Sequence, residues 1–169
     1  MQHRTNLQQD TGRYEELVRA RLKMQGDDAH HLEHVCTHNN VSWINHSMAT
    51  TVEMTWIALR DVPGPAVLII GGIDRAEDHD RLKELVMEKV NTVVCMGSTP
   101  WKYFNAYREA ANLVVQARDL QEAVEYAFVL AQDGETVLFS PSCPSYDAFD
   151  NYRNRGDEFR RLVLARVKK

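Results

Sequence analysis

The segment LFSPSCPSYDAF, residues 138–149, places three serines, two prolines and one cysteine within six consecutive positions after an apolar run. The hydroxyls of Ser140, Ser142 and Ser145 could hold an anion together with the free backbone N–H groups of a helix that starts near Ser145. Simple N-capping of that helix by Ser145 is the competing interpretation. Cys143 could be a nucleophile, but no motif places a histidine base beside it, so a small buried thiol is favoured.

A second candidate site is the turn GGIDR, residues 71–75. Its two glycines allow a close backbone approach, and Arg75 could pair with a carboxylate or a phosphate. The sequence GxxxxGK(S/T) occurs nowhere in the 169 residues, so the turn is not a P-loop. On its residues alone, an ordinary strand-to-helix turn is the favoured interpretation.

A third candidate is the concentration of five histidines between residues 30 and 46. If residues 33–38 form a strand, His34, Cys36 and His38 point to one face and could ligate zinc. Their spacing is not that of a known zinc motif, so exposed hairpin histidines are favoured over a metal site.

Hydrophobic periodicity predicts the elements that must position these residues. Two short runs flanking Asn39-Asn40 predict a β-hairpin over 33–44. Apolar runs predict further strands over 66–70, 92–96, 113–115 and 136–140. Helical spacing predicts helices over 13–24, 48–59, 82–90 and 100–111, one capped by Asp119 with Glu122 three residues on, and one that begins just past Gly156 and reaches Val167.

Strands that alternate with helices indicate an α/β fold. We expect a small doubly wound, mostly parallel, Rossmann-like sheet with helices on both faces and an N-terminal β-hairpin. In such sheets ligands bind outside the carboxyl ends of the strands. The turns at 71–75, at Gly97 and at 140–145 all follow strands, so they should meet at that edge.

Composition is that of one ordinary globular domain, with 44% hydrophobic and 26% charged residues. A net charge of −4 gives no electrostatic reason to expect nucleic-acid binding. The longest apolar run, 66–70, is far too short for a membrane span, and the N-terminus lacks the apolar core of a secretory signal. Three widely spaced cysteines do not make a disulfide framework, so a cytoplasmic location is expected.

Three motifs, in this order, resemble the C-terminal domain of the Mur ligases. They are HHLEHVCTHNNVSWINHSMATT at 30–51, AVLIIGGIDR at 66–75 and LFSPSCPSYDAFDNYRNRGDEF at 138–159. The similarity is greatest to the branch that uses ATP to add D-glutamate to UDP-N-acetylmuramoyl-L-alanine in bacterial peptidoglycan synthesis. The resemblance implies two parts. Residues 1–29 would be a tail plus the linker helix that ends the central domain, and residues 30–169 the amino-acid-binding C-terminal domain.

The resemblance also implies how the candidate turns are used. Ser145, Tyr146 and Tyr152 match the positions that hold the incoming amino acid, with Tyr152 where the family usually has phenylalanine. Thr50 and Arg75 match groups that hold a carboxylate. Asn151, Arg155 and Gly156 also match the family pattern, and Gly156 is expected to end one helix so that the next can dock.

Three positions depart from the family pattern. In the motif N-D-S-K-A-T-N, which reads NHSMATT at 45–51, Met48 replaces the substrate-facing lysine and His46 the acidic residue. His31 stands where an arginine serves the nucleotide. A cation facing an anion cannot be replaced by a thioether, so no catalytic position is intact.

The resemblance therefore implies a ligase domain that is inactive alone, because the P-loop and UDP-sugar domains are absent from the sequence. ATP and Mg²⁺ would be cofactors of the full-length ligase only. Its partners would be D-glutamate, the UDP-sugar precursor and the central ATP-binding domain, in cis or in trans. The alternative is a non-catalytic Mur-like binding or regulatory protein, and a His/Cys metal-binding module is a remote third.

Overall fold

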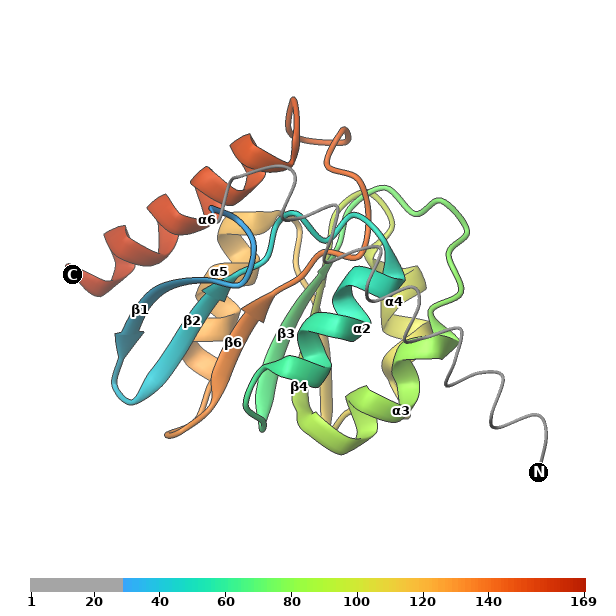
Figure 1. The fold of residues 1–169 in the computed structure, drawn as a ribbon, viewed down its shortest axis with the longest axis horizontal. Coiled ribbons are helices and arrows are strands. Elements are labelled where there is room, and N and C mark those ends of the chain that lie inside the picture. Colours follow the sequence, from blue (N-terminus) through green and yellow to red (C-terminus); the bar gives the residue numbers. More distant parts are fainter. Residues whose placement is uncertain (1–28) are drawn as a thin grey trace.

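The structure, a computed structural model, describes residues 29–169 and contains one six-stranded sheet with the strand order β1-β2-β6-β3-β4-β5 (Figure 1). Only β1 is antiparallel to its neighbour, and the other pairs are parallel. The helix expected over 13–24 lies outside the described residues. The strands are β1 (Glu33–His38), β2 (Val41–Asn45), β3 (Ala66–Gly71), β4 (Val90–Met96), β5 (Leu113–Gln116) and β6 (Thr136–Phe139).

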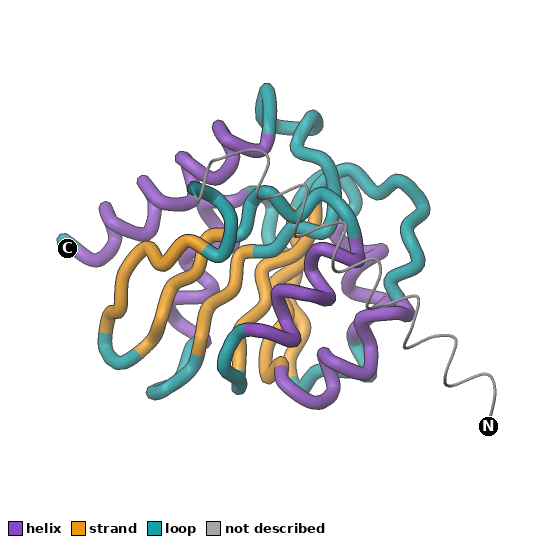
Figure 2. The backbone as a smooth tube through the Cα atoms, in the orientation of Figure 1, coloured by secondary structure: helices purple, strands orange, loops and turns teal. Residues whose placement is uncertain are grey.

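Helices cover both faces of the sheet, as Figures 1 and 2 show. They are α2 (Val52–Asp61), α3 (Asp80–Lys89), α4 (Pro100–Tyr107), α5 (Leu120–Leu130) and α6 (Tyr152–Val167). Side chains of β3 alternate between two cores: Val67 and Ile69 pack with α5 and α6, whereas Leu68 and Ile70 pack with α2, α3 and α4. The doubly wound, mostly parallel fold is therefore confirmed. Among the described helices, none has the length and apolarity that crossing a bilayer requires.

The N-terminal hairpin is confirmed, but its first strand contains an irregularity that the sequence did not indicate. Asn39 and Asn40 both take positive φ, 49° and 59°, in the connecting turn. The pairing register shifts between His34 and Cys36, which marks a β-bulge. A bulge inserts one extra residue, here Val35, and so breaks the alternation of side chains along the strand.

This bulge overturns the expectation that His34, Cys36 and His38 share one face. Cys36 and His38 pair with Trp43 and Val41, whose side chains belong to the core beneath α5 and α6. His34 is instead exposed and shares a hydrogen bond with Thr37 (Nε2 to Oγ1, 2.9 Å). In residues 29–169 no group of three His, Cys, Asp or Glu side chains could hold a metal ion.

Helix α2 begins later than expected, and helix α6 begins earlier. Helix α2 starts at Val52 rather than at 48, because the Thr51 hydroxyl accepts from the Met54 N–H (3.4 Å) and caps the helix there. Helix α6 starts at Tyr152, because the Asn151 side chain accepts from the N–H groups of residues 153 and 154 (2.9 and 3.0 Å). The expected starts at 48 and past residue 156 were therefore wrong.

The family pattern suggested that Gly156 ends a helix, but this residue lies buried inside α6. A Cβ at this position would lie 2.2 Å from Nδ1 of His30. The missing side chain therefore lets the His30 ring lie directly against the helix backbone, which is a packing role that local sequence does not reveal.

Candidate functional site

The loops that follow β3 and β6 meet at the carboxyl edge of the sheet, as expected. Gly71 N–H donates to the Pro141 carbonyl (2.9 Å), and Ile73 N–H donates to the Pro144 carbonyl (3.4 Å). These two backbone bonds fix the 71–75 turn against the serine-rich segment. The 71–75 turn and the serine-rich segment, which are two of the three candidate sites found in the sequence, therefore pack together as one unit.

Glycines make this close packing of loops possible. A Cβ at Gly72 would lie 2.7 Å from Cys143 Sγ and 2.8 Å from the Pro144 carbonyl oxygen. A Cβ at Gly97, after β4, would lie 2.5 Å from the Gly72 Cα. Gly97 also has a φ of +94°, which side chains disfavour. The backbones of three loops therefore touch where a side chain would normally separate them.

Arg155, a buried residue of α6, ties the loop after β2 to the loop after β6. Its Nε donates to Ser47 Oγ (3.1 Å), its Nη2 to the Ser47 carbonyl (2.8 Å) and its Nη1 to the Cys143 carbonyl (2.9 Å). The side chain is only 1% exposed, and burial lowers its pKa to about 10. The guanidinium is therefore a charged structural clamp at neutral pH.

A second set of hydrogen bonds holds the start of α6 to the loop after β2. Ser47 Oγ donates to the Tyr152 carbonyl (2.7 Å), and the Asn45 side-chain amide donates to the Gly156 carbonyl (3.2 Å) and to Glu33 Oε2 (2.9 Å). Sequence reasoning missed these roles. The available signal was that Asn45, Ser47 and Arg155 belong to the motifs, but no structural role was predicted for them.

The serine-rich segment is buried, and Ser145 is not at a helix start. Its carbonyl accepts from the N–H groups of Ala148 and Phe149 (3.3 and 2.9 Å), so it begins a tight turn, and the cap of α6 is Asn151. The N-capping interpretation and the expected helix start near Ser145 were therefore wrong, whereas an anion site at these hydroxyls stays a prediction. The Ser145 side chain lies instead at the joined loops, with the residue 2% exposed.

The other residues of this segment serve the packing. Ser140 Oγ bonds with Thr55 Oγ1 (2.8 Å), and Ser142 Oγ is buried with no partner among the described residues. Cys143 is 1% exposed, and burial raises the pKa of its thiol to about 11. A thiol held protonated at neutral pH is a poor nucleophile, so the small buried thiol expected from the sequence is confirmed.

The side chains matched to amino-acid binding lie around the joined loops. Tyr152 is the first residue of α6 and is half-buried, with the Arg153 guanidinium 5.0 Å from the centre of its ring. Thr50 is half-buried immediately before the cap of α2, whereas Arg75 and Tyr146 are exposed. The contacts through Ser47 and Pro144 bring these side chains to one edge of the sheet, from three loops and one helix.

The Arg75 loop is fixed on α4 through its neighbour Asp74. Lys102 Nζ donates to Asp74 Oδ2 (2.9 Å), and Asp74 Oδ1 accepts from the Ala76 N–H (2.9 Å). Burial alone would raise the pKa of Asp74, but these hydrogen bonds and the Lys102 charge outweigh it and lower the pKa. An ionised Asp74 therefore holds the turn that presents Arg75 to solvent.

The positions that depart from the family pattern are packed rather than open. Met48 is 4% exposed, and its N–H donates to the His30 carbonyl (3.1 Å). His46 Nδ1 accepts from the Leu32 N–H (3.1 Å), and the His31 ring lies 5.3 Å from the His46 ring. Burial, followed by the charge of His31, lowers the pKa of His46 to about 3, so His46 is neutral.

The fold is that of a known class of protein. The family model "Mur ligase, glutamate ligase domain" matches residues 30–143, and the chain belongs to this family. The UDP-N-acetylmuramoylalanine–D-glutamate ligase of Cytophaga hutchinsonii is 39% identical over 145 residues, which is 86% of this chain and 32% of that protein. That of Christiangramia forsetii is 40% identical over 134 residues, 79% of this chain and 30% of that protein.

The chain thus spans about a third of the length of the curated relatives it matches. Solved structures agree in fold. The bifunctional folylpolyglutamate synthase/dihydrofolate synthase of Yersinia pestis gives a TM-score of 0.55 at 12% identity, over 81% of this chain and 30% of that chain. The MurF ligase of Thermotoga maritima in complex with ADP gives 0.52 at 11% identity, over 82% and 31%.

Proposed function

We propose that this chain is the amino-acid-binding unit of an ATP-dependent ligase that adds D-glutamate to UDP-N-acetylmuramoyl-L-alanine. The observation that carries the proposal is the joining of the Arg75 turn, the Ser145 segment and the start of α6 into one edge. The relatives named as D-glutamate ligases support the choice of amino acid.

The proposed role of this edge is to hold and orient the amino acid. Arg75 would pair with one carboxylate, and Thr50 and Ser145 would offer hydroxyl donors. The ring of Tyr152 would pack against the aliphatic part of the ligand. Two N–H groups of the first turn of α6 are already bonded to the Asn151 side chain, so the helix end contributes little to holding an anion.

The bond-forming step would need the rest of a longer ligase. ATP and Mg²⁺ would be held by a central domain, where they would activate the acceptor carboxylate as an acyl phosphate. This chain would present the amine of D-glutamate to that group across a closed domain interface. Its contribution is positioning, so we propose that it has no ligase activity alone.

A second function is favoured by one observation. Met48 is buried, and its neighbour His46 is neutral, so the family's substrate-facing charge at these positions is absent. The absence of this charge would be expected in a Mur-like binding or regulatory protein that holds a small carboxylate without catalysing a reaction.

A chimaeric enzyme distinguishes the two functions. Residues 30–169 would replace the matching C-terminal part of the Cytophaga hutchinsonii ligase, and ADP release would be measured with and without D-glutamate. Release that depends on D-glutamate, and that is lost on Arg75→Ala, supports the ligase function. A folded chimaera that binds D-glutamate without releasing ADP supports the binding function instead.

A further inference from the structure

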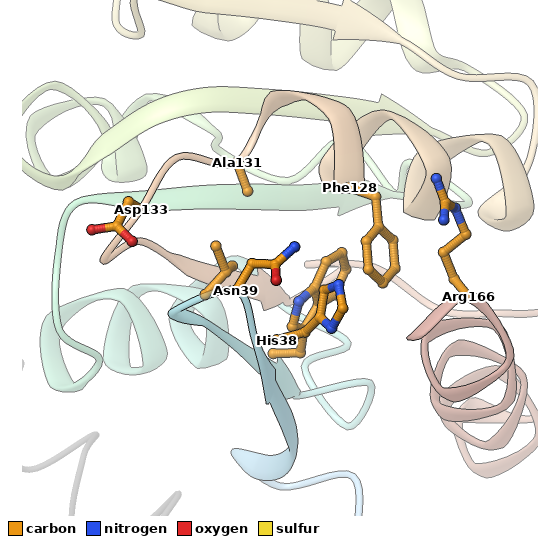
Figure 3. Close-up of a pocket in the computed structure, with 8 residues that line it drawn as sticks. His38, Asn39, Phe128, Ala131, Asp133 and Arg166 are labelled. Atoms are coloured by element: carbon orange, nitrogen blue, oxygen red, sulfur yellow. The ribbon is translucent and has the colours of Figure 1, made fainter. Parts of the chain in front are cut away.

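The groove beside the β1–β2 turn, shown in Figure 3, is filled by its own side chains. Trp43 stacks on the Phe128 ring, with the ring centres 4.1 Å apart, and the Arg166 guanidinium lies 5.4 Å from the centre of the same ring. The indole Nε1 of Trp43 is itself buried. Within the described residues this groove therefore offers a ligand no free ring face, whereas the opposite edge of the sheet holds a buried pair of titratable side chains next to Arg75.

The loop that carries Arg75 has a buried ionisable residue at each end. Asp74 follows the Gly71-Gly72 turn after β3, and His79 directly precedes α3. Their side chains are only 8% and 11% exposed, and His79 Nε2 lies 3.7 Å from Asp74 Oδ1. Arg75, between them in sequence, is exposed. The pair therefore closes a short loop whose exposed cation is the one proposed to hold a carboxylate.

Helix α4 fixes the His79 ring from the other side. The rings of Tyr103 and Tyr107 meet it edge-on, with centres 4.9 and 6.2 Å away. The Tyr107 hydroxyl lies 3.3 Å from His79 Nδ1 and donates to the His79 carbonyl (3.4 Å). A hydroxyl whose proton goes to the carbonyl can only accept from Nδ1, so Nδ1 carries the proton of the neutral ring. Nε2, which is buried and has no hydrogen-bond partner in residues 29–169, then turns a lone pair toward a carboxylate.

A second proton on the ring would change this contact from repulsion into a hydrogen bond. Nε2–H would donate to Asp74 Oδ1, the oxygen that already accepts from the Ala76 N–H (2.9 Å). Ala76 has a φ of +59°, which side chains disfavour, so its conformation depends on that bond. Sharing the oxygen between two donors would weaken the bond and shift the backbone directly after Arg75.

The other charges around His79 do not change in mild acid. The titratable and charged groups of its own loop, of the start of α3 and of α4 are Asp74, Glu77, Asp78, Asp80, Lys102, Tyr103 and Tyr107. Burial lowers the pKa of His79, and the neighbouring carboxylates, Asp74 first, partly offset this effect. Burial also raises the pKa of both tyrosines, so they stay protonated. A proton that this cluster takes up between about pH 7 and 5 therefore goes to His79.

We propose that His79 is a positioning residue for carboxylate binding, which acts through Asp74 on the turn that carries Arg75 and makes the binding depend on pH. The proton gained in acid adds a positive charge beside this turn, so a carboxylate should bind more tightly there. The ligand in this proposal rests on the function proposed above. The coupling of His79 to Ala76 does not, because it is a property of the loop alone.

The coupling is tested without a ligand, on the whole 169-residue chain. In NMR spectra recorded from about pH 8 to 5, the Ala76 amide signal should follow protonation of the His79 ring, with one midpoint below about 6.5. The shift should disappear in His79→Gln and persist in His34→Gln, at an exposed histidine of β1. An Ala76 signal that does not follow the His79 ring in the wild type, which needs no variant, overturns the proposal.

The positioning role is tested with D-glutamate as the probe. Its dissociation constant should be about threefold lower at pH 5 than at pH 7.5 in the wild type. His79→Gln should remove this difference and also controls for protonation of the ligand itself. Binding that does not change with pH contradicts the role of His79 alone. Absence of binding at both pH values contradicts the proposed function as well, so the two failures are distinguishable.

Discussion

The guanidinium of Arg155 donates to both oxygen atoms of Ser47, from Nε to the hydroxyl at 3.1 Å and from Nη2 to the carbonyl at 2.8 Å. With the third bond, to the Cys143 carbonyl, one side chain joins α6 to two loops of the candidate site. The architecture of the joined loops at the carboxyl edge of the sheet therefore depends on a charged residue that is itself buried.

Arg155→Met should destabilise the fold by about 2–4 kcal/mol, because it leaves the two carbonyls of Ser47 and Cys143 without donors. Urea unfolding followed by circular dichroism measures the change. Arg161→Met, at an exposed ion pair on the same helix, should change stability by less than about 0.5 kcal/mol. Similar effects of the two substitutions would contradict the clamp.

Gly156→Ala should destabilise the fold by about 1–3 kcal/mol, although alanine is the better helix former, because its Cβ would meet the His30 ring. The same substitution in a His30→Ala background should be neutral or stabilising. A double-mutant cycle of unfolding free energies measures this coupling. Additive effects of the two substitutions on the unfolding free energy would show that the Cβ at position 156 and the His30 ring do not clash.

Acid should weaken the fold through His46. Its native pKa is about 3, below the ordinary value, so between about pH 6.5 and 3 the unfolded chain binds a proton that the native chain does not. Stability therefore falls as the pH falls through this window. From pH 7 to 5 the wild type should lose about 1–2 kcal/mol more than His46→Asn, which keeps an acceptor for the Leu32 N–H.

Urea unfolding at the two pH values checks this expectation. His34→Asn is the matched control, because His34 is exposed and should show the wild-type dependence on pH. A wild-type dependence that survives in His46→Asn would assign the effect to other groups.

D-Glutamate should bind the isolated chain at the carboxyl edge of the sheet with millimolar affinity, about −4 kcal/mol, since no other domain closes over it. NMR shifts are expected at residues 72–75 and 142–152. Arg75→Ala should weaken binding about tenfold, because it removes the charged partner of one carboxylate. Arg81→Ala, which breaks a surface ion pair with Glu53, should not. Unchanged spectra in tens of millimolar ligand would rule the site out.

The substitutions at 46 and 48 can be reversed in the chimaeric ligase. If they limit catalysis, Met48→Lys together with His46→Asp should raise D-glutamate-dependent ADP release about 30- to 150-fold, which corresponds to roughly 2–3 kcal/mol. Met87→Lys, at a residue that is 68% exposed on α3, is the control and should have no effect. A chimaera that already turns over at the rate of its parent would show that neither departure matters.

The parts of the fold that the sequence predicted are those determined by local patterns. Continuous apolar runs such as 66–70 are long enough to be recognised as buried strands, and the structure buries all of β3. The cap at Asp119 was also predictable, and its Oδ1 accepts from the Glu122 N–H at 2.8 Å. Local chemistry alone determines these features.

The parts that failed depend on residues that are distant in sequence. Ser145 resembles a helix cap, but its carbonyl accepts hydrogen bonds within a turn, and Asn151 caps α6 instead. Gly156 resembles a helix end until His30 is placed beside it. Arg155 resembles a surface residue because arginines are seldom fully buried. Likewise, a bulge at Val35 leaves no mark in a pattern of alternating side chains.

The contact of Gly72 with Gly97 has a consequence for how this edge can diversify. Any side chain at either position would force two loop backbones apart, so random mutation has almost no acceptable outcome there. Substitutions at Arg75, Tyr146 and Thr50 meet no such barrier, because these side chains lie at or near the surface. If the proposed binding role holds, descendants of this chain can therefore change their ligand preference by exchanging a few outward-facing groups, while the loop geometry beneath them is inherited unchanged.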